Sequence, residues 1–214
     1  MSPNTSNTRN WVSGSELLCV SLERQKIDRK MKIEFNPITV KLKNSKEVTI
    51  RSAETYDAEK LLKTIKEYVN DSDYIPKISE EIKITIQQEE DWINSFIQKE
   101  NSILLIAEFE GEIIGNLDVT GNSRIIMQHT AVIGMGMLSE WRNSGLGTEL
   151  MKYSIEWAKE NPILELLWLQ VYTENLLGLN LYKKMEFIEN GIIKNYFKQN
   201  GKYYDNLTMS LSVK

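Results

Sequence analysis

The stretch that decides the fold reads Ile133-Gly134-Met135-Gly136-Met137-Leu138-Ser139-Glu140-Trp141-Arg142-Asn143-Ser144-Gly145-Leu146-Gly147-Thr148. An apolar run ends in a polar turn with two glycines, and an amphipathic pattern follows at once. Glycines at 145 and 147 let backbone N–H groups approach an anion closely, and the N-terminus of a helix adds its partial positive charge. The stretch therefore predicts a strand, a turn and a helix that together bind a phosphate or pyrophosphate.

Two nucleotide-binding motifs share this physics but fit the stretch poorly. A P-loop needs a Lys-Ser or Lys-Thr pair after its glycines, and none follows here. A dinucleotide-binding turn has a third glycine at the position that Leu150 occupies. Two alternatives stay open at this point: an unrelated nucleotide-binding domain, and a glycine-rich start of a helix in which Ser144 is only a cap.

Around this stretch the sequence alternates between strand and helix patterns. Residues 164–172 are apolar on both faces, as in a central strand, and Asn200-Gly201 is a strong hairpin signal. Strands are expected at residues 38–42, 48–51, 103–109, 113–120, 125–138, 164–172, 187–198 and 202–213, and helices at residues 53–69, 84–97, 144–159 and 175–185. No repeat or low-complexity linker divides these elements, so we expect one α+β domain over residues 31–214.

The first thirty residues differ from the rest, because they begin with a Ser-, Asn-, Thr- and Pro-rich run and show only a weak apolar cluster. Glu16, Ser21 and Glu23 interrupt any apolar region of a signal peptide. We expect residues 1–30 to be an N-terminal extension of unclear role.

Composition excludes several classes of function. The chain has 214 residues, 41% hydrophobic and 26% charged, with a net charge of −4, so a sequence-blind electrostatic attraction to nucleic acid is not expected. The longest apolar run, residues 131–138, is far below the roughly 20 residues of a membrane span. Cys19 and His129 are the only residues of their kinds, which excludes an internal disulfide and cysteine-rich or histidine-cluster metal sites. We expect a cytoplasmic protein without a bound metal, membrane or nucleic-acid partner.

Two further motifs lie downstream of Arg142-x-x-Gly145-x-Gly147. They are Asn175-Leu176-Leu177-Gly178-Leu179-Asn180-Leu181-Tyr182 with Lys183-Lys184-Met185-Glu186-Phe187, and Gly201-Lys202-Tyr203-Tyr204-Asp205-Asn206-Leu207-Thr208-Met209. In this order the three resemble the motifs of the Gcn5-related N-acetyltransferase (GNAT) superfamily, over about residues 48–213. The resemblance implies a GNAT-like fold, in which helices flank a central mixed, mostly antiparallel sheet.

The resemblance also implies a function, an acetyl-CoA-dependent N-acetyltransferase in which a primary amine of a small molecule or peptide attacks the thioester directly. The backbone of Met135, Gly136 and Met137 would pair with the cofactor as an added strand, and an N–H near Met137 or Leu138 would polarise the thioester carbonyl. Asn175 would cap its helix and contact the cofactor. The pyrophosphate would lie against Arg142, Asn143, Ser144, Gly145, Leu146, Gly147 and Thr148. Whether Arg142 acts there as a point charge or only as a residue of the turn stays open. By analogy with the fold, a homodimer through exposed sheet edges is compatible with this reading.

For catalysis, the resemblance makes Tyr182 the general acid, since a phenol of pKa roughly 10 can protonate a departing thiolate. A tyrosine that only packs over the sheet is the alternative. Gln170 stands where many family members have a basic glutamate, so the base stays open between His129, Asp118 and a water chain. Gln170 also leaves open a catalytically weak, regulatory domain that binds acyl-CoA. Glu186 replaces a family glycine, and we expect a distorted turn there.

Overall fold

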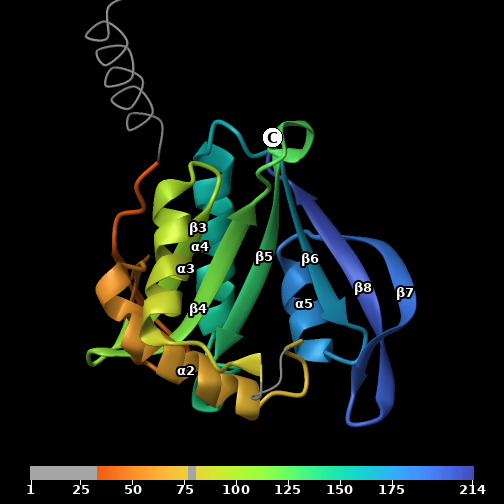
Figure 1. The fold of residues 1–214 in the computed structure, drawn as a ribbon, viewed down its shortest axis with the longest axis horizontal. Coiled ribbons are helices and arrows are strands. Elements are labelled where there is room, and N and C mark those ends of the chain that lie inside the picture. Colours follow the sequence, from red (N-terminus) through yellow and green to blue (C-terminus); the bar gives the residue numbers. More distant parts are fainter. Residues whose placement is uncertain (1–32, 77–80) are drawn as a thin grey trace, which may run out of the picture. The chain divides into compact units, whose positions relative to one another are not determined.

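Alternating strand and helix patterns build one mixed sheet in the computed structural model, which describes residues 33–76 and 81–214 (Figure 1). The strands are β1 (Ile38–Lys41), β2 (Glu47–Ser52), β3 (Ile103–Phe109), β4 (Glu112–Gly121), β5 (Thr130–Met137), β6 (Leu166–Tyr172), β7 (Ile188–Gln199) and β8 (Lys202–Ser212). The helices are α2 (Ala58–Asn70), α3 (Ile86–Gln98), α4 (Leu146–Glu160) and α5 (Leu176–Lys184), with short 3₁₀ turns at Thr55–Asp57, Ile125–Met127 and Ser139–Trp141. The prediction for residues 1–30 lies outside the described residues.

Across these residues the strand order is β1-β2-β3-β4-β5-β6-β8-β7. Every neighbouring pair is antiparallel except β5 and β6, which are parallel. The helix α4 connects these two strands, as a parallel pair requires a long crossover. The α+β class and the mixed, mostly antiparallel sheet predicted from the sequence are therefore confirmed.

Helices cover both faces of the sheet, and β3 shows how. Leu105 and Ala107 pack in one core cluster with the buried residues of α4, whereas Leu104 and Ile106 pack in a second cluster with α2 and α3. Since successive side chains of a strand point to opposite faces, a strand between two helical layers must be apolar at every position. Figure 1 shows α4 on one side of β3 and β4, with α2 and α3 on the other.

The parallel strands β5 and β6 pair only over a short length. Thr130, Ala131 and Val132 are opposite residues 166–168 of β6, and no pairing continues beyond them. Residues 133–137 of β5 keep their partners on β4, so their other edge has no strand beside it within the described sheet. Figure 1 shows the two strands diverging. An unpaired strand edge presents N–H and C=O groups that another extended chain can bind.

One strand is shorter than the sequence predicts. Residues 125–138 were expected to form a single strand, but β5 begins at Thr130 and Ile125–Met127 form a 3₁₀ turn. The backbone N–H of Arg124 donates to the side chain of Asn122 at 2.9 Å, and this local bond turns the chain. Ile125 is apolar but 82% exposed, so its strand-like character was misleading.

The expected distortion after α5 is also wrong, since the turn closes with regular hydrogen bonds. Glu186 is left-handed, with φ of 66°. Its N–H donates to the carbonyl of Lys183 at 3.0 Å, and the N–H of Phe187 donates to that of Tyr182 at 3.0 Å. These two bonds are the Schellman ending of a helix, whose left-handed position glycine fills most easily. The family glycine is therefore replaced without loss of the turn, at the cost of an unfavourable backbone conformation.

Replacing Glu186 by glycine should stabilise the protein. Glycine has no Cβ to oppose the left-handed conformation, so the substitution stabilises the folded state. The greater conformational freedom of glycine in the unfolded chain offsets part of this stabilisation. Glu186→Gly is therefore expected to raise the free energy of unfolding by about 1 kcal/mol. Urea unfolding followed by circular dichroism measures this change. Glu186→Ala is the matched control, because it removes the carboxylate but keeps the Cβ. Equal stability of the two variants would contradict the explanation.

Candidate active site

The turn before α4 places backbone N–H groups at the open end of a helix. Gly145 is the N-cap of α4, with φ of 96°, and Asn143 is also left-handed, with φ of 61°. The carbonyl of Gly145 accepts from the N–H groups of Thr148 and Glu149 at 3.0 and 3.1 Å. The first N–H groups of an α-helix have no intrahelical partner, so this end of α4 favours an anion.

Arg142, which was predicted to lie against the pyrophosphate, is held by another element. Its guanidinium lies 3.1 Å from a carboxylate oxygen of Asp71, and it also donates to the backbone carbonyl of Asp71 at 3.3 Å. Asp71 is the residue that ends α2. Arg142 therefore fastens the turn to α2, with part of its charge neutralised.

Two glycines of β5 allow close packing on the face of the sheet that α2 covers. A Cβ at Gly136 would overlap the ring of Tyr68, and a Cβ at Gly134 would lie 2.6 Å from the Oδ1 atom of Asp118. The hydroxyl of Tyr68 donates to Asn116 at 3.0 Å. Burial, with a smaller contribution from the charge of Asp118, raises the pKa of Tyr68 far above its ordinary value. Tyr68 is thus a neutral side chain that packs on the β5 backbone.

On the other face, the end of β5 meets both α4 and α5. The position of a Cβ on Gly147 would be 3.1 Å from Met137, 3.5 Å from Met135 and 3.4 Å from Leu181. The side chain of Asn175 caps α5 and accepts from the N–H of Gly178 at 3.0 Å. The structure thus brings the predicted cofactor residues of β5 and of the α4 turn together, next to α5.

Tyr182 lies on α5 and packs against the main core cluster, with its ring centroid 6.1 Å from that of Phe187. Burial raises its pKa to about 12. The phenol therefore stays protonated at neutral pH and can donate a hydrogen bond. This pKa lies about two units or more above the pKa range of thiols, which is roughly 8.5–10. Proton transfer from Tyr182 to a thiolate is therefore less favourable than it would be from a phenol with the unperturbed pKa of 10.

A family model described as the acetyltransferase (GNAT) family matches residues 61–187, more than half of the chain. The chain belongs to this family. The L-amino acid N-acetyltransferase AaaT of Escherichia coli K12 is 27% identical over 161 residues, which cover 74% of this chain and 94% of AaaT. The family predicted from the three motifs is therefore confirmed, and the protein is a GNAT N-acetyltransferase.

Solved structures agree with this assignment. A GNAT acetyltransferase from Streptococcus pneumoniae superposes with a TM-score of 0.75 at 28% identity and covers 77% of this chain and 99% of its own. The protein yncA of Salmonella typhimurium, determined with its cofactor acetyl-CoA, shares the fold with a TM-score of 0.70 at 16% identity, over 78% of this chain and 94% of its own.

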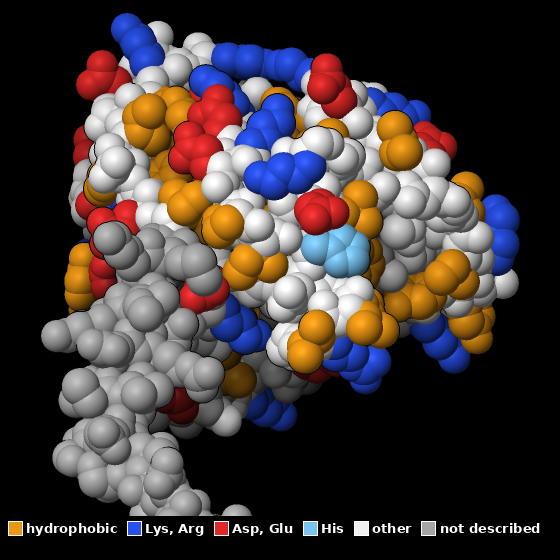
Figure 2. Space-filling model, turned by 90° about the horizontal axis from the view of Figure 1, so that it is seen from above, with side chains coloured by type: hydrophobic (Ala, Val, Ile, Leu, Met, Phe, Trp, Pro, Cys, Tyr) orange, Lys and Arg blue, Asp and Glu red, His pale blue; other side chains and the backbone are white. Residues whose placement is uncertain are grey.

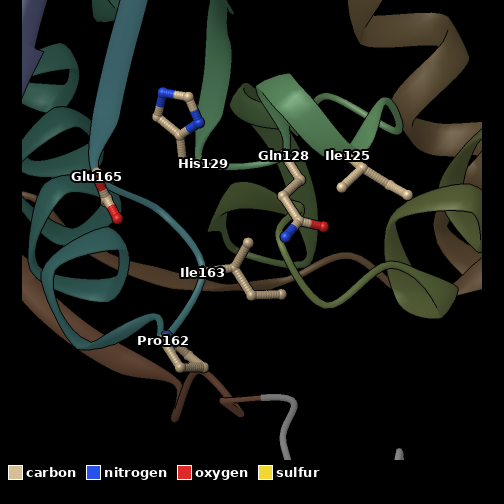
Figure 3. Close-up of a pocket in the computed structure, with 6 residues that line it drawn as sticks. All are labelled: Ile125, Gln128, His129, Pro162, Ile163 and Glu165. Atoms are coloured by element: carbon tan, nitrogen blue, oxygen red, sulfur yellow. The ribbon is translucent and has the colours of Figure 1, made fainter.

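His129, one of the predicted bases of this GNAT protein, lies far from the other predicted residues. His129 precedes the first residue of β5, whereas Leu138 follows the last residue of this strand. Because a strand rises about 3.3 Å per residue, roughly 30 Å separates His129 from Leu138. Figure 3 shows it instead beside a surface pocket of about 410 Å³ between the segments that lead into β5 and β6. Figure 2 shows the histidine at the surface of this end of the molecule. The structure does not bring His129 to the cofactor residues, because the two ends of one strand cannot meet.

Asp118, the other residue predicted as a possible base, is better placed. It is opposite Gly134 in the β4–β5 register, just beyond the point where β5 and β6 part. The hydroxyl of Thr120 donates to its Oδ2 atom at 3.0 Å. Gln170 lies two residues beyond Trp168, the last residue of β6 that pairs with β5. Gln170 thus comes from a strand that borders the parting, whereas Asp118 comes from β4, on the paired side of β5.

The sequence did not predict the roles of Tyr68, a residue of α2, and of Asp71, the C-cap residue of α2, which both support the site. Tyr68 fits the helical spacing of the apolar face that predicted this helix, which is the only signal it carries. Within residues 33–76 and 81–214, no three candidate metal ligands come together and no helix is long and apolar enough to cross a membrane.

The contact between Gly136 and Tyr68 can be tested through stability. Gly136→Ala should lower the free energy of unfolding by roughly 1–3 kcal/mol, because the added methyl group overlaps a buried ring. Thermal unfolding of the purified protein measures the loss. Gly191→Ala on β7 is the control, because its Cβ would meet nothing within 4 Å. A Gly136→Ala variant as stable as the Gly191→Ala variant would show that Tyr68 does not press on β5.

Proposed function

We propose that this GNAT protein transfers the acetyl group of acetyl-CoA to a primary amine of a small molecule or peptide, by direct attack of the amine on the thioester. The unpaired edge of β5 at residues 133–137, which leads into the α4 turn, carries this proposal. Amide groups of the pantetheine arm would pair with that edge, and the pyrophosphate would lie at the N-terminal turn of α4. The cofactor supplies an activated thioester, and the chain holds and orients it.

Asp118 is the proposed general base, directly or through one water. Attack forms the bond from the amine nitrogen to the acetyl carbon, and the proton that the nitrogen loses must go to an acceptor. Asp118 supplies a carboxylate next to Gly134, two residues beyond the last β5 residue that pairs with β6, whereas Gln170 cannot accept a proton usefully. Gly134 leaves room for this carboxylate, since a side chain there would press on it.

Tyr182 is the proposed acid. As the bond from carbon to sulfur breaks, negative charge develops on the departing sulfur, and the phenol donates a hydrogen bond and finally a proton to it. Burial keeps the phenol protonated, because its pKa is about 12. A backbone N–H near Met137 would stabilise charge on the carbonyl oxygen. The N–H of Leu138, the other predicted donor, instead donates to the carbonyl of Ile114 at 3.0 Å.

Acceptors with an α-amine are the first to test, because the relative AaaT is an L-amino acid N-acetyltransferase. The overall charge of −4 is too small to select a cationic acceptor.

Acetyl-CoA should raise the melting temperature of the full chain. A ligand at about 100 times its Kd adds roughly 2.7 kcal/mol to the free energy of unfolding, which gives a clear shift, whereas ATP and NAD should give none. Release of the free thiol in the presence of L-amino acids and short peptides then measures turnover. Binding without turnover would favour a regulatory acyl-CoA-binding domain. A shift with ATP or NAD equal to that with acetyl-CoA would contradict the proposed cofactor.

The two catalytic roles predict losses in kcat with little change in cofactor binding. Asp118→Asn and Tyr182→Phe should each lower kcat by roughly 10²–10⁴-fold while the Kd of acetyl-CoA changes by less than about threefold. The active form of the phenol is the protonated one, and its pKa is about 12. At pH values below about 10, ionisation of this phenol should therefore not reduce the wild-type rate. Asp91→Asn on the exposed face of α3 and Tyr56→Phe, at a side chain 75% exposed, are the controls. A variant that turns over at the wild-type rate would remove that residue from the mechanism.

A further inference from the structure

The phosphate-binding turn carries little free positive charge of its own. Residues 142–148 contain one cation, Arg142, and Asp71 lies 3.1 Å from its guanidinium. Coenzyme A carries a pyrophosphate and a 3′-phosphate, which together hold several negative charges. The backbone N–H groups of the turn bind such anions, but a cation at a helix N-terminus would add a charge-assisted contact.

A lysine from the distant β1–β2 turn reaches this place. The backbone N–H of Lys43 donates to the carbonyl of Ser144 at 2.9 Å, which holds the two turns together. The Cγ, Cδ and Cε atoms of Lys43 lie 3.5, 3.8 and 3.8 Å from the position that a Cβ on Gly145 would occupy. The stem of the lysine therefore runs over Gly145, the N-cap residue of α4.

The ammonium of Lys43 is available to a ligand. Among the described residues it has no ion pair or hydrogen bond. Its neighbour Lys46 is engaged differently, since its ammonium lies 4.8 Å from the ring centroid of Phe109 and 4.6 Å from that of Trp141. Lys43 is therefore the cation next to Gly145 that no group of residues 33–76 and 81–214 neutralises.

We propose that Lys43 is a phosphate-binding residue of the cofactor site. Its ammonium pairs with a phosphate of coenzyme A at the N-terminus of α4, and Arg142 instead holds the turn against α2. Gly145 serves twice, because it adopts the left-handed conformation of the turn and leaves a path for the lysine stem. This inference rests on the proposed function, since it requires coenzyme A at the α4 turn.

Calorimetric titration of the full chain with coenzyme A tests the proposal. Lys43→Gln should raise the Kd about tenfold, as expected for the loss of one charge-assisted contact, and should lower the dependence of Kd on salt concentration. Lys43→Arg should bind within about twofold of wild type. Lys41→Gln is the matched control, because Lys41 is an exposed lysine two residues earlier on β1, and it should leave the Kd unchanged. All variants keep the backbone bond to Ser144, so their melting temperatures should match that of wild type.

Titration with 3′-dephospho-coenzyme A distinguishes the two phosphate groups. If Lys43 pairs with the pyrophosphate, Lys43→Gln weakens both ligands by the same factor. If it pairs with the 3′-phosphate, only coenzyme A is weakened. Either result supports the proposal.

A Lys43→Gln variant that binds coenzyme A within twofold of wild type, with an unchanged salt dependence, overturns the role of Lys43 alone. A wild-type chain that binds no coenzyme A overturns the proposed function as well, so the two failures are distinguishable.

Discussion

The candidate site depends on the early parting of β5 and β6. Three residues of each strand pair, and then residues 133–137 keep only their β4 partners. The sheet thus contains an open strand edge in its interior rather than at its rim. Backbone groups on such an edge have hydrogen-bonding capacity to offer, and a ligand with amide groups can use it. Because β4 pairs with residues 131–137 of β5, the sheet holds the strand on the side opposite this edge.

The support for that edge comes from α2. Tyr68 packs on Gly136 from one side of the sheet, and Asp71 at the end of the same helix binds Arg142 of the α4 turn. One helix therefore positions both the strand and the turn. On the opposite face α4 and α5 approach through Gly147, so the end of β5 lies between α2 on one side and α4 and α5 on the other. The small residues of β5 and α4 are what allow this close approach.

The sequence predicted the arrangement of elements better than their contacts. Its three motifs led to the family, and Asn175 caps α5 as its residue type suggested. The prediction of a strand from residue 125 was wrong, because a side-chain hydrogen bond of Asn122 turns the chain where the apolar pattern is uninterrupted. The distorted turn expected at Glu186 was also wrong, because a non-glycine residue can adopt the left-handed conformation when two hydrogen bonds close the turn around it. Both errors arose where a local hydrogen bond outweighed the preference of a residue type.

By itself the sequence determined the α+β class, the order of the elements and the glycine turn before α4. These follow from periodicity and from the backbone preferences of glycine, which act over a few residues. Only the tertiary structure decided that Arg142 pairs with Asp71, that Lys43 lies over Gly145, and that Asp118 rather than His129 is next to residues 133–137 of β5. The first two pairs are 71 and 102 residues apart in the chain, and such contacts depend on strand order and register. No local pattern encodes these, because they result from the packing of the whole sheet.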